Sequence, residues 1–250
     1  RYQRLYGLDV DAETNIVVSA GATGALYCSC LALLEPGDEV LLFEPYYSYH
    51  ESTIVATQAV PVFVPTKAPD WSFSMDELEN AVTGRTRAII VNTPSNPSGK
   101  VWSRAEIELV AEFSKRHDLF VFTDEIYEHI VYDDARHLPM AALDGMAERT
   151  VTINSLSKTY SVTGWRVGWA IAPDWLTGSI RKVHDFLTVG AAAPLQAAGA
   201  VALSLPETYY TELAVGYQRR RDMLLALLEP RGFVPFKPDG AYYIMTDIGA

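Results

Sequence analysis

Six short apolar runs of four to six residues recur along the chain. They lie at residues 40–43, 61–64, 88–91, 119–123, 151–154 and 167–172. Most are apolar throughout rather than alternating, which is typical of strands that are covered on both faces. Helical patterns lie between them, at residues 24–34, 75–82, 104–117 and 176–187. This order predicts an α/β fold with a mainly parallel sheet and helices on both of its faces.

The pattern changes after Pro194. Residues 206–229 have the periodicity of one long helix, and residues 231–248 have that of two strands joined by a turn. We therefore predict two domains. Residues 1–205 would form a large domain, and residues 206–250 would form an interdomain helix and the start of a small C-terminal α/β domain.

The charge balance and the residue composition limit the kinds of function that the chain can have. The chain has 20 basic and 31 acidic residues, so a nucleic-acid partner is disfavoured. The one dense basic run, residues 219–221, fits a solvated helix face. Cys28 and Cys30 fit buried reduced thiols, and the five histidines show no spacing typical of metal ligands. No apolar run reaches the ~18 residues of a membrane span. We expect a cytoplasmic protein.

Polar groups follow four of the predicted strands or turns, where ligands of open α/β sheets bind. The stretch SAGATGAL, 19–26, could hold an anion on the free amides of a helix start. The loop NTPSNPSG, 92–99, would present the amide of Asn96. The stretch TDEIYEHI, 123–130, places Asp124 at a strand end and Tyr127 three residues later. Taken singly, these also fit a plain loop, a tight turn and a helix cap.

The fourth place is NSLSKTYSVTGWRVGWA, 154–170. Lys158 near a strand end suits a Schiff base with a carbonyl compound. Arg166 suits a bidentate contact with phosphate, and Ser155 adds a hydroxyl donor. The same sequence is also compatible with a surface lysine and an arginine that forms an ion pair, without any ligand. Together, however, the four places fit a phosphorylated heteroaromatic aldehyde such as pyridoxal 5'-phosphate.

The stretch SLSKTYSVTGWRVG, 155–168, resembles the lysine signature of the class I/II aminotransferases, which are fold-type I pyridoxal phosphate enzymes. The motifs EPGDEVLLFEPYYSY, NTPSNPSG, TDEIYEHIVYD and PDGAYY are also similar to those of this family and occur in its order. The resemblance covers essentially the whole chain. It implies the large domain of that fold followed by the beginning of the small domain.

The resemblance also implies residue roles around the cofactor ring. Lys158 would form the internal aldimine, and Asp124 would pair with the protonated pyridine nitrogen. Tyr127 and Asn96 would hydrogen-bond the phenolic oxygen of the ring, and Tyr47 would stack on its face.

A second set of implied roles concerns the cofactor phosphate. The backbone amides of Ala22 and Thr23 would hold it, together with Ser155 and Arg166. No metal is implied.

The implied activity is transfer of an amino group from an L-amino acid, neutral or aromatic, to a 2-oxo acid, in a homodimer. The arginine that usually binds the substrate carboxylate and the usual N-terminal segment have no counterpart here, so we expect a fragment that lacks both ends. Three alternatives stay open. They are a lyase or synthase of the same fold, such as a C–S β-lyase or an aminocyclopropane carboxylate synthase, a non-catalytic sensor domain of a transcription regulator, and an α/β domain without cofactor.

Overall fold

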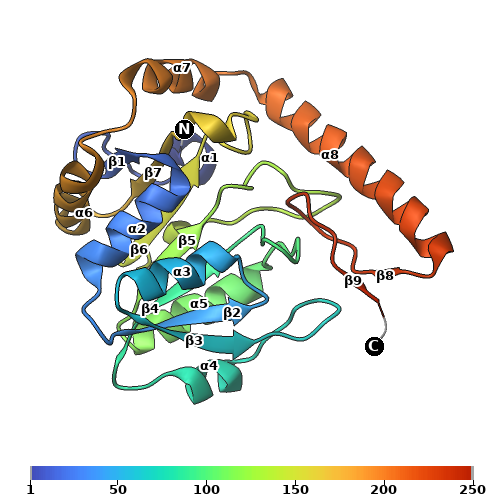
Figure 1. The fold of residues 1–250 in the computed structure, drawn as a ribbon, viewed down its shortest axis with the longest axis horizontal. Helices are drawn as coiled ribbons and strands as arrows, with labels where there is room; N and C mark the ends of the chain where they lie inside the picture. Colours follow the sequence, from blue (N-terminus) through green and yellow to red (C-terminus); the bar gives the residue numbers. More distant parts are fainter. Residues whose placement is uncertain (1, 249–250) are drawn as a thin grey trace.

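In the computed structural model, which describes residues 2–248, the chain folds around one seven-stranded sheet (Figure 1). The strand order is β1-β7-β6-β5-β4-β2-β3. Strands β3, β2, β4, β5 and β6 are mutually parallel, whereas β7 runs antiparallel to β6 and to β1. The predicted mainly parallel sheet is therefore confirmed. The strands are β1 (Ile16–Ser19), β2 (Glu39–Glu44), β3 (Val60–Pro65), β4 (Thr86–Asn92), β5 (Phe120–Asp124), β6 (Thr150–Ser155) and β7 (Gly168–Ile171).

Helices cover both faces of the sheet because alternate strand residues point to opposite sides. On β2, Val40 and Leu42 pack in one apolar cluster with α2 (Gly21–Leu33), α3 (Ser48–Ala56) and α6 (Asp174–Thr188). Leu41 and Phe43 pack in a second cluster with α4 (Met75–Ala81) and α5 (Arg104–Arg116). Continuous apolar runs are thus needed on the central strands, as the sequence indicated.

The sequence patterns did not predict three elements, which are β1, α3 and α7 (Ala193–Leu203). Helix α3, SYHESTIVA, is rich in polar and β-branched residues, which have low helix propensity. Its helix is stabilised by packing instead, since Ile54 is fully buried and Thr53 and His50 are nearly so. Strand β1 has only four residues, IVVS, and α7 is almost uniformly small and apolar.

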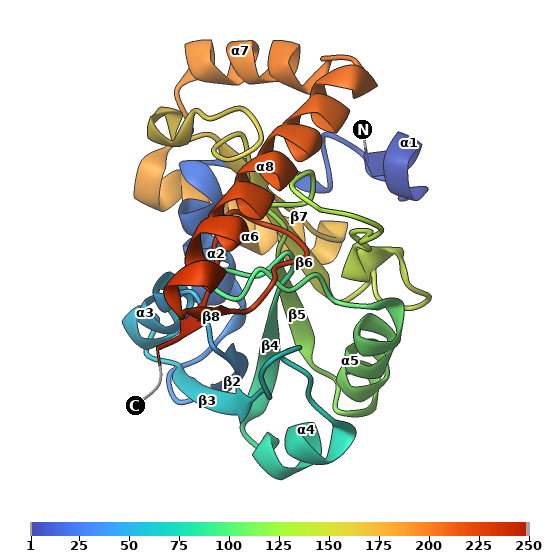
Figure 2. The same ribbon diagram turned by 90° about the vertical axis from the view of Figure 1, so that its right-hand side faces the viewer.

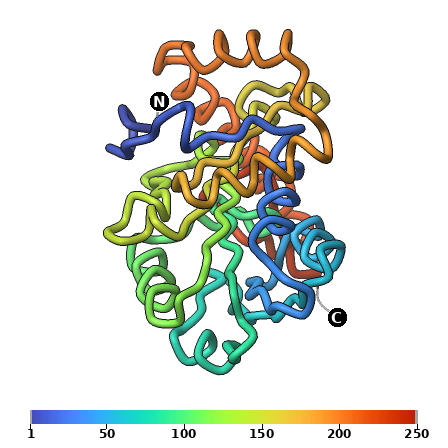
Figure 3. The backbone as a smooth tube through the Cα atoms, turned by 90° about the vertical axis from the view of Figure 1, so that its left-hand side faces the viewer, coloured from blue at the N-terminus to red at the C-terminus, as the bar shows by residue number. Residues whose placement is uncertain are grey.

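The C-terminal part of the chain contains the predicted long helix, α8 (Glu207–Leu228), and a short antiparallel pair, β8 (Val234–Pro235) with β9 (Thr246–Asp247). Figure 2 shows α8 crossing in front of the sheet. The first helix, α1 (Tyr2–Tyr6), lies far from the C-terminal end of the chain (Figure 3). The division into two domains at residue 205 stays a prediction.

The basic run at residues 219–221 corrects one expectation. Arg219 and Arg220 are exposed, but Arg221 is buried, with only 5% of its surface accessible. Its guanidinium Nη1 lies 2.9 Å from the Asp133 carboxylate and its Nη2 lies 2.7 Å from Asp222. The run is therefore only partly a solvated face, because its third residue fastens α8 to the loop after β5.

Both cysteines are buried and free, as predicted. No helix among residues 2–248 combines the length and the apolar character that a membrane crossing requires.

Candidate active site

The parallel strands β4, β5 and β6 end side by side at one edge of the sheet. In the register, Asn92 is opposite Asp124, and Asp124 is opposite Ile153. The loop with Asn96, the carboxylate of Asp124 and the turn with Lys158 therefore meet in one place. This is the edge where ligands of open α/β sheets bind.

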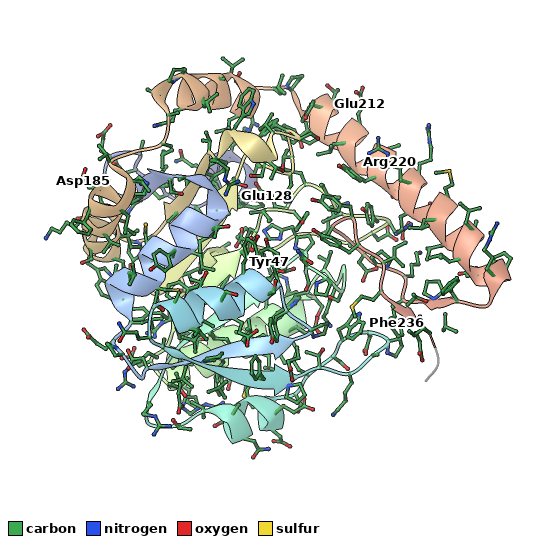
Figure 4. All side chains as sticks on the ribbon, viewed as in Figure 1. Tyr47, Glu128, Asp185, Glu212, Arg220 and Phe236 are labelled. Carbon is green, nitrogen blue, oxygen red and sulfur yellow. The ribbon has the colours of Figure 1, made fainter. Side chains whose placement is uncertain are left out.

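A cavity of about 440 Å³ lies at this edge. Seven of the nine predicted site residues line it, namely Ala22, Thr23, Tyr47, Asp124, Ser155, Lys158 and Arg166. The other two, Asn96 and Tyr127, do not line this cavity. Asn96 lies in a smaller adjoining pocket that shares His50 with it. Figure 4 shows Tyr47 near the centre of the molecule, with Arg220 and Glu212 on α8 to one side.

One end of the cavity is built from backbone. Gly21 opens α2 with φ +78°, and a Cβ there would lie 2.2 Å from Nη2 of Arg166. A Cβ on Gly168 would lie 2.5 Å from the backbone nitrogen of Ala22. These two glycines allow the first turn of α2, β7 and the Arg166 guanidinium to come close together. The result is a cradle of helix amides next to a cation, which suits a phosphate group.

Arg166 keeps its charge available for such a group. Its guanidinium donates to the carbonyl oxygens of Thr163 and Ala20, at 2.8 and 3.5 Å. Within residues 2–248 it makes no ion pair with a carboxylate. Ser155 is buried beside it, and its backbone N–H donates to the Asn154 side chain at 2.7 Å.

The other end of the cavity is built from side chains. Asp124 is 7% exposed, and its Oδ2 lies 2.9 Å from Nε2 of His50. Nδ1 of His50 is buried and has no hydrogen-bond partner in the described structure. The Tyr47 ring stands perpendicular to the His50 ring, with centroids 5.5 Å apart. A buried carboxylate of this kind favours a cation beside it, such as a protonated ring nitrogen.

Sequence reasoning missed His50. The signal that could have revealed it is its spacing from Tyr47 in the stretch YYSYH, because residues three apart share one face of a helix. Tyr47 is the N-cap residue of α3 and His50 lies in its first turn, so both reach the site from the same end of this helix.

Lys158 follows β6 by three residues and lies between two cavities. It lines the one already described and a second one of about 440 Å³ that extends toward α8. Its Nζ lies 5.9 Å from the ring centroid of Tyr127 and 5.6 Å from that of Tyr242. Burial alone would raise the pKa of Tyr242, but the hydrogen bonds from Lys158 and Tyr127 and the Lys158 charge lower it.

Asn96 and Tyr127 are brought together by a residue that sequence reasoning did not single out. Nδ2 of Asn96 donates to the hydroxyl of Tyr243 at 3.3 Å. The hydroxyls of Tyr127 and Tyr243 are 3.0 Å apart. Tyr243 is the last residue of the motif PDGAYY, whose resemblance to the family assigns it no role.

A buried network of ion pairs is connected to the site through Asn154. Glu125, Glu128 and His137 place ligand atoms within 4.8 Å of one another, a grouping that sequence spacing did not indicate. Each carboxylate already has a histidine beside it, since His137 lies 3.0 Å from Glu125 and His129 lies 3.2 Å from Glu128. Glu128 also accepts from Asn154 Nδ2 at 2.9 Å, which connects the network to Ser155.

The cradle, the buried carboxylate and the lysine fit the phosphate, the ring nitrogen and the aldehyde of pyridoxal phosphate. Comparison with known proteins agrees. Kynurenine–oxoglutarate transaminase 3 of Rattus norvegicus is 38% identical over 266 residues, which cover 100% of this chain and 59% of the relative. The chain spans about three fifths of the length of the curated relatives it matches.

Solved structures show the same relationship. N-succinyldiaminopimelate aminotransferase from Mycobacterium tuberculosis superimposes with a TM-score of 0.94 at 42% identity, over 96% of this chain and 63% of that one. Aspartate aminotransferase from Thermus thermophilus, with maleate, gives 0.93 at 32% identity, over 98% and 64%. The sequence pattern of the family "Aminotransferase class I and II" matches residues 1–250. The chain therefore belongs to the class I and II aminotransferases, a family of pyridoxal phosphate-dependent enzymes.

Proposed function

We propose that the protein is an aminotransferase that moves an amino group from an L-amino acid to a 2-oxo acid with pyridoxal phosphate. The observation that carries the proposal is the single cavity shared by Lys158, Asp124 and the phosphate cradle around Arg166. A lysine that can form a Schiff base, an acid for a pyridinium and an anion site are the protein groups this cofactor requires.

The cofactor, when bound, supplies an aldehyde carbon that condenses with amines and a protonated ring that accepts electron density from the substrate Cα. Asp124 would hold the proton at the ring nitrogen, and His50 contacts Asp124 at 2.9 Å and would keep its carboxylate in place. Because both side chains are buried, little water competes for the carboxylate, and its electrostatic effect on the ring nitrogen is strong.

Lys158 has two roles. Its Nζ would hold the cofactor through the aldehyde group. When the amino group of the substrate displaces it, Nζ would accept the proton of the substrate Cα and later donate it back. Its position on the border of two cavities lets it serve both without leaving the site.

The remaining residues orient the reactants. The amides of Ala22 and Thr23 would hold the phosphate with Ser155 and Arg166, and Tyr47 would pack against the ring. Holding the cofactor at both ends would fix the orientation of the substrate Cα–H bond, which favours proton removal over loss of carboxylate. Asn96 and Tyr127 would donate to the ring oxygen.

We propose a neutral or aromatic amino acid as the donor. Support comes from the aromatic rim of the site, where Tyr47 and Tyr49 stack with centroids 4.8 Å apart. The name of the rat relative, a kynurenine–oxoglutarate transaminase, points the same way. 2-Oxoglutarate or pyruvate would be the acceptor.

We further propose a cytoplasmic homodimer. Apolar side chains around α6 and α7 support a contact between copies, since Phe186, Val189 and Val201 are 89%, 84% and 67% exposed. Light scattering of the purified protein should give twice the mass of one chain. A monomer that remains fully active would refute this part of the proposal.

The test of the activity is the visible absorption spectrum with pyridoxal phosphate, before and after a mixture of L-amino acids is added. We expect a yellow band that bleaches, with one oxo acid formed per site. Ammonia and pyruvate in place of the oxo acid would identify a β-lyase. A band that does not change would identify a binding protein without turnover.

A further inference from the structure

We infer that Tyr243 is a positioning residue for this reaction: its hydroxyl orients the Asn96 amide and the Tyr127 hydroxyl toward the cofactor ring. The inference rests on the proposed function and goes beyond it, because it assigns a role to the C-terminal hairpin of the chain. Asn96 and Tyr127 come from different loops, and the Tyr243 hydroxyl is their common hydrogen-bond partner, at 3.3 and 3.0 Å.

The Asn96 amide keeps a free donor while it contacts Tyr243. Burial raises the pKa of the Tyr243 hydroxyl to about 12, although the hydrogen bond with Tyr127 opposes this rise. When Tyr243 accepts one amide proton from Asn96, the second amide proton remains available. The 3.0 Å contact with Tyr243 fixes the position of the Tyr127 hydroxyl.

The backbone around Tyr243 is fixed independently of these two contacts. Ala241 N donates to Ile130 O at 2.9 Å, and Gly240 N donates to Gly99 O at 2.8 Å. The Tyr132 hydroxyl donates to the Ala241 carbonyl. The hairpin is thus bound to the segment that follows Tyr127.

The hairpin is also packed against the loop that carries Asn96. A Cβ on Gly99 would lie 2.3 Å from Cβ of Pro238, and a Cβ on Gly240 would lie 2.8 Å from Cβ of Pro94. Gly99 is the last residue of NTPSNPSG and has φ +71°. Such close contacts leave the hairpin little room to shift, so Tyr243 is a rigid reference point for both loops.

The test is Tyr243→Phe, with Tyr132→Phe as the matched control. Both variants remove one tyrosine hydroxyl at the hairpin, but the Tyr132 hydroxyl donates to the Ala241 carbonyl rather than contacting the Asn96 amide or the Tyr127 hydroxyl. The readouts are the pKa of the visible band of the bound cofactor, the Kd of the cofactor, kcat and KM, and the melting temperature of the cofactor-free protein.

For Tyr243→Phe we expect the pKa of the band to rise by about half a unit or more, because the ring oxygen loses well-aligned donors to its negative charge. We expect kcat to fall about tenfold with little change in KM. Tyr132→Phe should lower the melting temperature and leave the pKa of the band unchanged. Tyr243→His keeps a ring and a hydrogen-bonding nitrogen, so the pKa of its visible band should lie closer to that of wild type. This variant replaces Tyr243→Phe in the test if the Phe variant does not fold.

Two results would overturn the inference while the proposed function stands. One is a normal band whose pKa and Kd are the same in Tyr243→Phe and wild type. The other is tighter cofactor binding in Tyr243→Phe, which would mean that Tyr243 competes with the cofactor for Asn96 and Tyr127. If the wild-type protein forms no band, the proposed function fails first, and this inference fails with it.

Discussion

The sheet region and the C-terminal region of this molecule are held by different forces. In the sheet region, side chains such as Val40, Ile89 and Val121 are completely buried between two layers of helices. In α8, a helix of 22 residues, only Tyr210 and Arg221 are buried. The sheet region is therefore stabilised mainly by apolar burial, whereas α8 and the hairpin depend on directional polar contacts.

This difference matters for the site. The lysine, the carboxylate and the phosphate cradle all lie on the apolar-packed scaffold, while Tyr243 contacts Asn96 and Tyr127 from the part held by hydrogen bonds. We infer that the sheet region carries the chemistry and that the C-terminal region adjusts it. The following predictions test this division, and the largest expected effect comes first.

Lys158→Ala should reduce transamination at least about a thousandfold, because Lys158 is the lysine that lines the cavity with the phosphate cradle and would move the Cα proton. Noncovalent cofactor binding should persist, because the phosphate cradle is untouched. The loss is measured as the rate of oxo-acid formation from an amino acid that the wild-type protein accepts. Lys182→Ala, an exposed lysine on α6, is the control and should keep full activity.

Asp124→Asn should lower kcat by about a hundredfold, since an amide of the same shape cannot keep a proton on the ring nitrogen. His50→Gln should cost less, about tenfold, because it acts only through Asp124. If His50→Gln were the more damaging change, His50 rather than Asp124 would be the primary partner of the ring.

Gly168→Ala should weaken cofactor binding and lower the free energy of unfolding by about 1–3 kcal/mol, because its Cβ would meet the backbone of Gly21 and Ala22 at 2.5 Å. Gly178→Ala in α6 has no heavy atom within 4 Å of the new Cβ, apart from its own helix and neighbours. It should instead stabilise the protein by about 0.5–1 kcal/mol. Denaturant titration of both variants checks the contrast, and equal effects would contradict it.

Arg221→Met should loosen α8 without affecting the sheet. It removes the 2.9 Å ion pair with Asp133 and the hydrogen bond to the Pro238 carbonyl. Hydrogen exchange in α8 should accelerate by about tenfold, while exchange in β4 and β5 stays unchanged. The exposed neighbour supplies the control, Arg219→Met, for which no change is expected.

Acid should release the same contact with a smaller effect. Hydrogen bonds from Arg221 and Lys237 lower the pKa of Asp133 to about 2. Because this pKa is lower in the folded state, the contribution is present above the ordinary value near 3.8 and is lost as the pH falls toward 2. The rate of hydrogen exchange in α8 should therefore rise as the pH falls through this interval. A rise that begins at higher pH in the sheet strands than in α8 would contradict the proposed difference between the two regions.

Sequence patterns were sufficient where local and tertiary preferences agree. The apolar runs of β2, β4, β5 and β6 and the long helix α8 were predicted because their periodicity is strong. Helix α3 was missed because its stability comes from packing that only the folded chain provides. The burial of Arg221 depends on Asp133, which is 88 residues away in the sequence.

The same distinction applies to the site. Groups at strand ends could be predicted because parallel strands finish at one edge. His50 and Tyr243 could not, because their roles depend on contacts with Asp124, Asn96 and Tyr127 that span 74 to 147 residues.

The central claim is that Lys158 bonds the aldehyde carbon of pyridoxal phosphate at the edge of the sheet. Borohydride reduction of the protein mixed with the cofactor, followed by mass spectrometry of its peptides, tests this most directly. We expect one stoichiometric modification, on the peptide that contains Lys158, and none in Lys158→Ala. Modification of another lysine, or none in wild type, would contradict the account.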